Sequence, residues 1–218
     1  MTLSIGIFGG TFDPVHYGHL KTVEHVIGCV LLDRVEFIVS ARPPHREAPV
    51  ADPTHRYAML DRALAPFPRF HANRNEIDRP GPSYMVWTLR ALRHASPGCR
   101  WCLILGADQY HALPTWYHWQ EILSYVHIVV LQRAVADAAA SRPARWGARI
   151  THDPEQLVRS DAGWVFFCDT PLIDISATAV RAGLAAGRDV RSEVPASVLD
   201  YIYEHGLYSV DKSRSHAI

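Results

Sequence analysis

Residues 5–20 read IGIFGGTFDPVHYGHL, and this stretch decides the fold. Its apolar first half predicts a buried strand over residues 3–8, because β-branched and aromatic residues fit a pleated surface that is packed on its faces. Gly9 and Gly10 then end the strand and let the backbone turn sharply. A strand-to-helix corner without Cβ atoms leaves backbone N–H groups accessible, so it predicts a site that can hold a phosphate.

Two histidines follow the glycine corner, at the start of a helix predicted over residues 18–32. His16 and His19 are three positions apart, which places both imidazoles on one face of that helix. Helix N-termini favour anions through free N–H groups and the macrodipole. The two side chains are therefore predicted to hold a phosphate by hydrogen bonds, while they bring little permanent positive charge to the site. A plain tight turn followed by surface histidines is the alternative.

Composition limits the classes of protein that fit. The 218 residues are 48% hydrophobic and 20% charged, which predicts one globular domain over residues 1–208 and a disordered polar tail over 209–218. Twenty-two basic and twenty-two acidic residues give a formal net charge of zero, so we expect neither nucleic acid nor an anionic membrane as a partner. The sequence has no apolar run of about 18 residues and no secretory signal pattern, so we expect a cytoplasmic protein.

Apolar runs of strand length alternate with helical patterns along the chain. This alternation predicts an α/β fold: a Rossmann-like, doubly wound parallel sheet with helices on both faces. Ligands of such sheets bind at the carboxyl ends of the strands, where the glycine corner lies. Residues 134–161 have few apolar positions and predict a surface excursion. The predicted strands cover residues 3–8, 35–39, 68–73, 101–105, 126–131 and 164–168, and the predicted helices cover 18–32, 53–65, 83–94, 115–123 and 195–206.

A second candidate phosphate motif lies at residues 174–181, DISATAVR. Ser176 is placed to cap a new helix, and Thr178 and Arg181 then share the face of its first turn. Hydroxyls, free amides and a guanidinium together make a good anion clamp. A plain capped helix with a solvated arginine is the alternative.

Two loops carry further candidates. Residues 43–46 are Pro-Pro-His-Arg, where two prolines fix an extended loop that can hold His45 and Arg46 over a ligand. A solvated loop is equally consistent. Gly106 follows a buried strand and permits close approach of a ligand, and Asp108 could accept from a ribose hydroxyl. The alternative for Asp108 is an N-cap of the next helix.

Aromatic and basic residues at other corners complete the candidates. Tyr84 and the pair Trp116-Tyr117 stand at loop-to-helix corners, where aromatic rings could sandwich a flat ring, although aromatics are usually core. Arg133, just past the fifth strand, is a further candidate phosphate contact. Residues 99–102 have the Cys-x-x-Cys spacing of a redox motif, but they run into an apolar strand, so we expect neither redox nor zinc chemistry there.

Together these elements resemble the bacterial nicotinate-nucleotide adenylyltransferase family, part of the nucleotidyltransferase superfamily with a His-x-Gly-His signature. The resemblance covers residues 5–208 and rests on GGTFDPVHYGH, PPHR, PSY, GxD, TWY, ISATxxR and the terminal YI…GLY. It implies an enzyme that transfers the adenylyl group of ATP to nicotinate mononucleotide, giving deamido-NAD and pyrophosphate in NAD biosynthesis.

The resemblance also implies roles for individual residues. The nicotinate ring would stack on Trp116 and lie near Tyr84, with Met85 and Tyr117 beside it. Backbone N–H groups would hold most of the acceptor carboxylate, and Met85, where many relatives carry Thr, offers the acceptor no hydroxyl. The catalytic residues would be His16, His19 and Arg181. The other ATP-binding residues would be Gly9, Gly10, Thr11, Phe12, His45, Arg46, Gly106, Asp108, Arg133, Ser176 and Thr178.

The mechanism expected from these residues needs no enzyme nucleophile. The acceptor's phosphate oxygen would attack the α-phosphorus of ATP in line, and positioning and charge stabilisation would supply catalysis. No side-chain cluster in the sequence predicts an all-protein magnesium cage, so Mg²⁺ would arrive with the ATP phosphates and no protein metal ligand is expected.

Other functions stay open at this point. Nicotinamide mononucleotide is the closest alternative acceptor, whereas the chain length and the Trp116 and Tyr84 elements disfavour pantetheine phosphate or CTP chemistry on a head group. A nucleotide-binding regulator without turnover is the alternative from another class. We expect a monomer or a small homo-oligomer.

Overall fold

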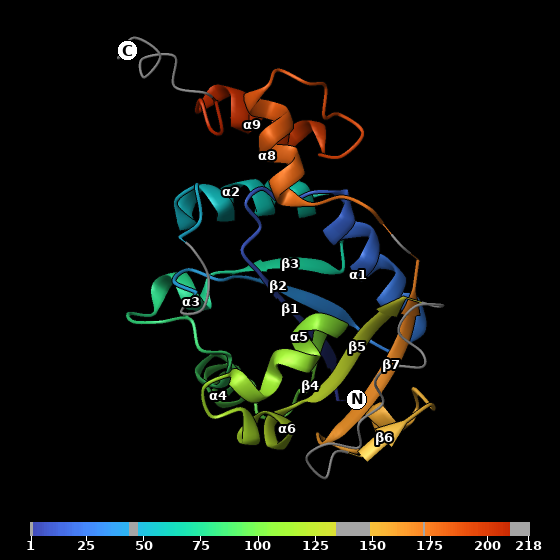
Figure 1. Cartoon of the computed structure of the whole chain (residues 1–218). Coiled ribbons are helices and arrows are strands. Elements are labelled where there is room, and N and C mark those ends of the chain that lie inside the picture. Colours follow the sequence, from blue (N-terminus) through green and yellow to red (C-terminus); the bar gives the residue numbers. More distant parts are fainter. Residues whose placement is uncertain (1, 44–47, 134–148, 172, 210–218) are drawn as a thin grey trace.

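The computed structural model describes residues 2–43, 48–133, 149–171 and 173–209, and these residues form one parallel sheet. The strand order is β3-β2-β1-β4-β5-β7-β6 (Figure 1). The predicted doubly wound parallel sheet is therefore confirmed, and each predicted strand lies close to its expected bounds. The strands are β1 (Ser4–Gly10), β2 (Arg34–Val39), β3 (Phe70–Asn73), β4 (Arg100–Gly106), β5 (His127–Arg133), β6 (Arg149–Thr151) and β7 (Trp164–Thr170).

The direction of the strand order reverses at β1, and this reversal opens the site. The chain moves from β1 through β2 to β3, then returns to the other side of β1 as β4. Pairing between β1 and β4 ends at Ile7 and Leu103, whereas β1 continues beside β2 as far as the Gly10–Val39 pair. The carboxyl ends of β1 and β4 thus separate into the crevice where doubly wound sheets bind their ligands.

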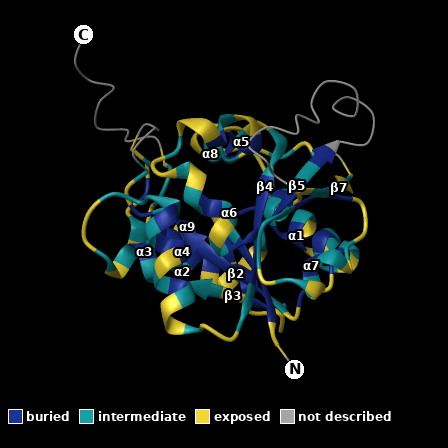
Figure 2. Ribbon diagram, turned by 90° about the horizontal axis from the view of Figure 1, so that it is seen from below, coloured by how far each residue is buried: buried dark blue, intermediate teal, exposed yellow. Residues whose placement is uncertain are grey.

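Helices cover both faces of the sheet. One apolar core joins α1 and α2 to the sheet, and α9 packs on α2 at the outside (Figure 1). A second core joins α4, α5 and α6 to the opposite face. Strands β4 and β5 are coloured mostly as buried in Figure 2, as a sheet covered on both sides requires. The helices are α1 (Tyr17–Cys29), α2 (Pro53–Leu64), α3 (Asn75–Asp78), α4 (Met85–Ala95), α5 (Ala107–Ala112), α6 (Ile122–Tyr125), α7 (Gln156–Arg159), α8 (Ala177–Ala185) and α9 (Ala196–Glu204).

The single helix predicted over residues 115–123 is wrong. The segment holds the end of one 3₁₀ turn (Leu113–Thr115), a second 3₁₀ turn (Trp119–Glu121) and the start of α6. Pro114 lies in the first turn of the Leu113–Thr115 3₁₀ helix, and His118, with φ +50°, adopts a left-handed conformation that no continuous helix contains.

The predicted surface excursion contains an edge strand and a short helix in its second half, β6 and α7, and residues 134–148 lie outside the described part of the chain. The predicted tail also lies outside it, except for Ser209. Over the residues that are described, the helices are all too short or too polar to cross a membrane.

Candidate active site

The predicted glycine corner lies at the end of β1, beside the β1/β4 crevice. A Cβ on Gly10 would lie 2.9 Å from Phe12 Cζ, and a Cβ on Gly9 would lie 3.2 Å from Met85 Cε. The Phe12 ring therefore leaves no room for a side chain at Gly10, and the Met85 side chain would have to shift slightly to admit one at Gly9. Phe12 is 1% exposed, so its ring belongs to the core and offers a ligand no side-chain surface.

His16 and His19 lie at the first turn of α1, as predicted, and their rings stack with centroids 3.7 Å apart. The His16 backbone N–H donates to His19 Nδ1 at 3.3 Å, which assigns the ring proton of His19 to Nε2. A Cβ on Gly18 would lie 2.8 Å from His16 Nδ1 and 3.3 Å from the carbonyl oxygen of Ile175. The glycine of the His-x-Gly-His motif therefore lets the His16 ring lie across the first helical turn.

Both imidazoles are neutral at pH 7. Burial lowers the pKa of His16 from 6.5 to about 4, although the Glu193 carboxylate opposes the change. Burial, and then the proximity of His16, lowers the pKa of His19 well below its ordinary value. His16 is 5% exposed, and its Nδ1 is buried without a hydrogen-bond partner among the described residues. This nitrogen lies over the first turn of α1, in a capping-box arrangement with His19, so it faces the helix backbone.

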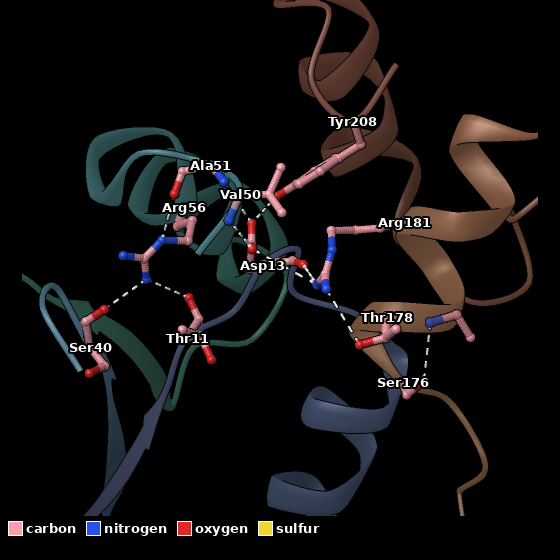
Figure 3. Close-up of polar contacts among 11 residues, drawn as sticks. Thr11, Asp13, Ser40, Val50, Ala51, Arg56, Ser176, Thr178, Arg181 and Tyr208 are labelled. Atoms are coloured by element: carbon pink, nitrogen blue, oxygen red, sulfur yellow. Dashed lines mark hydrogen bonds and ion pairs between the residues drawn. The ribbon is translucent and has the colours of Figure 1, made fainter. Parts of the chain in front are cut away.

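The second predicted phosphate motif lies beside the first. Ser176 is the N-cap of α8, and its hydroxyl accepts from the Ala179 N–H at 3.2 Å, which confirms the predicted cap. Arg181 Nη1 donates to the Asp13 carbonyl oxygen at 2.7 Å, and Nη2 donates to Thr178 Oγ1 at 3.4 Å (Figure 3). The Asp13 carboxylate is 3.9 Å from the guanidinium, a loose ion pair that leaves the positive charge available to an anion.

Asp13 holds this region together, a role that the sequence reasoning missed. Its Oδ2 accepts from the Val50 N–H at 2.8 Å, and its Oδ1 accepts from the Ala51 N–H at 3.1 Å and from the Tyr208 hydroxyl at 2.7 Å (Figure 3). Burial, and then the hydrogen bond to this carboxylate, raises the pKa of Tyr208, so the hydroxyl stays a donor. The loop between β1 and α1 is thereby tied to the start of α2 and to the C-terminal segment.

Arg56 of α2 is a second residue that the sequence reasoning missed. The side chain is 0% exposed, and its Nη1 donates to the carbonyl oxygens of Thr11 at 2.7 Å and Ser40 at 2.8 Å (Figure 3). Its Nε donates to the Ala51 carbonyl at 3.0 Å. Burial lowers the pKa of Arg56, and the Asp13 carboxylate opposes that change. One buried cation therefore fixes the loops that follow β1 and β2.

A pocket lies beside the glycine corner, and half of its walls are residues predicted from the sequence. Tyr84 and Tyr117 stack there with ring centroids 4.5 Å apart and an interplanar angle of 23°. Ser83 Oγ accepts from the N–H groups of Ala41 and Arg42, both at 3.0 Å, which fixes the loop after β2. The predicted residues that line the pocket are Gly9, Gly10, Thr11, Tyr84, Met85, Trp116 and Tyr117.

The other predicted residues lie outside this pocket's walls. His16, His19, Thr178 and Arg181 gather around the far end of the loop after β1, as described above. Gly106 is itself the N-cap of α5, so the alternative of an Asp108 cap is wrong. Instead, the Asp108 carboxylate is exposed and accepts from Gln109 Nε2 at 3.0 Å.

Three predicted cations fall where side chains are not described. His45 and Arg46 lie outside the described residues. Arg133 ends β5 at the carboxyl edge of the sheet, but its side chain is outside the described part. Their proposed phosphate contacts stay predictions.

Comparison with known proteins assigns the family. A sequence-family model described as cytidylyltransferase-like matches residues 7–183. Probable nicotinate-nucleotide adenylyltransferases from Halorhodospira halophila and Pseudomonas aeruginosa are 40% and 41% identical, and the alignments cover 94% of this chain and 95% and 96% of the relatives. The chain belongs to the nicotinate-nucleotide adenylyltransferase family. It is therefore a nucleotidyltransferase, as the motif resemblance implied.

Solved structures share the fold of this family member. Plasmodium falciparum nicotinic acid mononucleotide adenylyltransferase complexed with NaAD superposes with a TM-score of 0.71 at 15% identity, covering 94% of this chain and 97% of that one. A putative nicotinate-nucleotide adenylyltransferase from Vibrio parahaemolyticus superposes with a TM-score of 0.64 at 16% identity, covering 95% and 96%. The α/β architecture predicted from the sequence is thus that of the family.

Proposed function

We propose that the protein transfers the adenylyl group of ATP to nicotinate mononucleotide, giving deamido-NAD and pyrophosphate. The observation that carries the proposal is the meeting of two neutral imidazoles with the Arg181 clamp at one loop of the crevice. Relatives about 40% identical over nearly the whole chain bear the name of this activity.

The proposed mechanism is a single displacement. The acceptor's phosphate oxygen attacks the α-phosphorus of ATP in line, and pyrophosphate leaves without a covalent enzyme intermediate. His16 and His19 donate hydrogen bonds to phosphoryl oxygens, and Arg181 supplies fixed positive charge to the same oxygens as their charge develops. Backbone N–H groups of Gly9, Gly10 and Thr11 and the hydroxyls of Ser176 and Thr178 complete the phosphate contacts.

Magnesium fits this site as an ion carried by ATP. The pocket's carboxylate is Glu76, which is 4% exposed and already accepts from Thr88 Oγ1 at 2.6 Å. Mg²⁺ prefers several water and phosphate ligands to a dedicated protein cage. Bound to the phosphates, it would neutralise part of their charge.

The aromatic pocket supports the acceptor assignment. Tyr84, Trp116 and Tyr117 gather there, and aromatic faces suit a flat pyridine ring. Met85 brings no hydroxyl and packs against Gly9, so backbone N–H groups would read the nicotinate carboxylate. The adenosine of ATP would lie toward Gly106 and Asp108.

Pyrophosphate release with ATP and Mg²⁺ tests the reaction, with nicotinate and nicotinamide mononucleotides compared at equal concentration. We expect kcat/KM to favour the nicotinate form by at least about 100-fold, as for a site built around one polar group of its substrate. A preference for the nicotinamide form would overturn the acceptor assignment. If neither acceptor gives pyrophosphate release and the protein binds ATP tightly, the alternative of a nucleotide-binding regulator without turnover would be favoured.

The stereochemistry at phosphorus tests the mechanism. ATP made chiral at the α-phosphorus with sulfur should give a product of inverted configuration, because one in-line displacement inverts the centre. Net retention would mean two displacements through an adenylylated side chain, and it would overturn the direct mechanism.

A further inference from the structure

Three side chains outside the active site converge between α1 and β7. His25 and Cys29 are four residues apart on α1, which places them on one helix face, and Cys168 projects from β7 toward them. Their ligating atoms all lie within 4.8 Å of one another, and within the described parts of the chain this is the one such group of three or more His, Cys, Asp or Glu residues. Helix α1 lies alongside β7 (Figure 1).

We infer that His25, Cys29 and Cys168 form a binding site for a thiophilic divalent cation of the Zn²⁺ class. A tetrahedral zinc site with ordinary bond lengths separates its sulfur and nitrogen ligands by about 3.6 Å and two sulfurs by about 3.8 Å. Cys29 Sγ lies 3.4 Å from His25 Nε2 in this structure. The three atoms therefore need only a small adjustment to close around one ion.

The surroundings of the three ligands supply a candidate for the fourth position. The Asp169 carbonyl oxygen is 2.7 Å from His25 Nε2 and 3.9 Å from Cys168 Sγ. Because a carbonyl can only accept, His25 carries its proton on Nε2 in the metal-free protein. Metal binding would shift that proton to Nδ1 and replace the hydrogen bond by coordination, with the carbonyl oxygen or a water completing the tetrahedron.

Charge and burial also favour a cation here. Cys168 is 2% exposed, and its sulfur lies within 4.8 Å of the ligating atoms of Cys29 and His25. A bound Zn²⁺ would deprotonate both thiols, and two thiolates with one neutral imidazole then balance its charge. Cys29 and His25 are half-buried, so a metal ion can reach the site from solvent.

The position gives the site a structural role. Helix α1 begins at His16 and His19, and β7 leads into the segment that carries Ser176 and Arg181. A metal at the other end of α1 would cross-link α1 and β7, the two elements that bring the predicted phosphate motifs to one place. It would stabilise their arrangement without touching a substrate.

Cobalt(II) titration of the reduced full-length protein tests the site, because thiolate-bound cobalt shows charge-transfer absorption and tetrahedral d–d bands. We expect one Co²⁺ per chain with both features, displaced by Zn²⁺. Cys29→Ser should weaken binding by at least about 100-fold and reduce the charge-transfer band, since losing a ligand costs at least as much as losing an outer-shell partner. His25→Gln should weaken binding while keeping thiolate absorption.

Cys99→Ser is the matched control, because Cys99 is another half-buried free thiol and lies outside the cluster. It should bind cobalt like the wild type. Zn²⁺ at about 100 times its Kd should raise the melting temperature of the wild type and of Cys99→Ser by about 5 °C or more, but not that of Cys29→Ser.

Two results would overturn the inference. One is a wild-type spectrum without a thiolate band, or a band that Cys29→Ser leaves unchanged. The other is a reduced protein that binds no metal and, on mild oxidation, loses the mass of two hydrogens in the wild type but not in Cys29→Ser. That outcome would make Cys29 and Cys168 a disulfide couple instead. None of these readouts depends on the adenylyl-transfer activity.

Discussion

Replacing Tyr208 with Phe removes one hydroxyl and leaves the ring that packs beside the loop after β1. That hydroxyl donates to Asp13 Oδ1 at 2.7 Å, and Asp13 is 5% exposed. A hydrogen bond to a charged acceptor contributes about 1.5–3 kcal/mol. Because Ala51 still donates to the same oxygen, we expect a loss of about 2 kcal/mol, near the lower end of that range. For a chain of this length, that corresponds to a fall in melting temperature of about 4–8 °C.

Urea unfolding and thermal melts at pH 7 measure this loss, and Tyr203→Phe is the control. Tyr203 is 67% exposed on the preceding helix, so its hydroxyl should matter by less than about 0.5 kcal/mol. We also expect kcat to fall, because the Asp13 loop carries the carbonyl that Arg181 holds. A double-mutant cycle with Asp13→Asn should return a coupling of about 2 kcal/mol, within the range for contacting pairs. A loss for Tyr208→Phe no larger than that of Tyr203→Phe would refute the reasoning.

Three further predictions concern the first turn of α1. His19→Ala should lower kcat by about 100-fold or more, the scale of losing one pre-organised donor, and wild-type turnover would remove His19 from the mechanism. The folded pKa of His16 is about 4 against 6.5 unfolded, so the unfolded state binds more protons between these values and stability falls as pH drops through that window. Between pH 7 and pH 5 the wild type should therefore lose about 2 kcal/mol more in urea unfolding than His16→Gln, and equal losses would mean that His16 is solvated. Gly18→Ala should lower kcat by about tenfold to 100-fold by displacing the His16 ring, because small misplacements are that costly. Gly28→Ala in the same helix, where a Cβ would meet nothing within 4 Å, should keep full activity and gain up to about 1 kcal/mol in melts; equal effects of the two substitutions would contradict the steric argument.

The sheet and most helices follow from the sequence because their patterns record burial. Strands buried on both faces are continuous apolar runs, and α1 and α9 show apolar stripes at helical spacing. The existence of these strands and helices and their order along the chain could therefore be predicted. The segment around residues 115–123 could not, since Pro114 and the left-handed His118 divide a stretch whose composition is still helical. Local composition does not encode such breaks.

The site was predictable where one motif contains its own geometry. The glycine corner, the histidine pair and the Ser176 cap each depend on residues within a few positions. Asp13 acts through Val50, Ala51 and Tyr208, and contacts over such distances along the chain are set by the fold. Its part therefore could not be predicted from one sequence.

The sequence does contain a signal for the structural role of Arg56. It falls on the same helical stripe as the buried Met59, Leu60 and Ala63, where a charged residue is out of pattern. A cation at a core position needs buried acceptors, and the carbonyl oxygens of Thr11 and Ser40 are two of them. The helical pair His25 and Cys29 was also visible, but only the fold brings Cys168 to it.

The bond between Tyr208 and Asp13 joins positions 195 residues apart and so has a consequence for synthesis on the ribosome. The loop between β1 and α1 is translated early, yet it lacks this anchor until residue 208 has emerged. The partly made chain therefore cannot hold this loop in the finished conformation, however early the first strands pair. Activity should appear only after residue 208 has emerged, and a bulky fusion close behind Tyr208 should disturb the site more than one placed before β1.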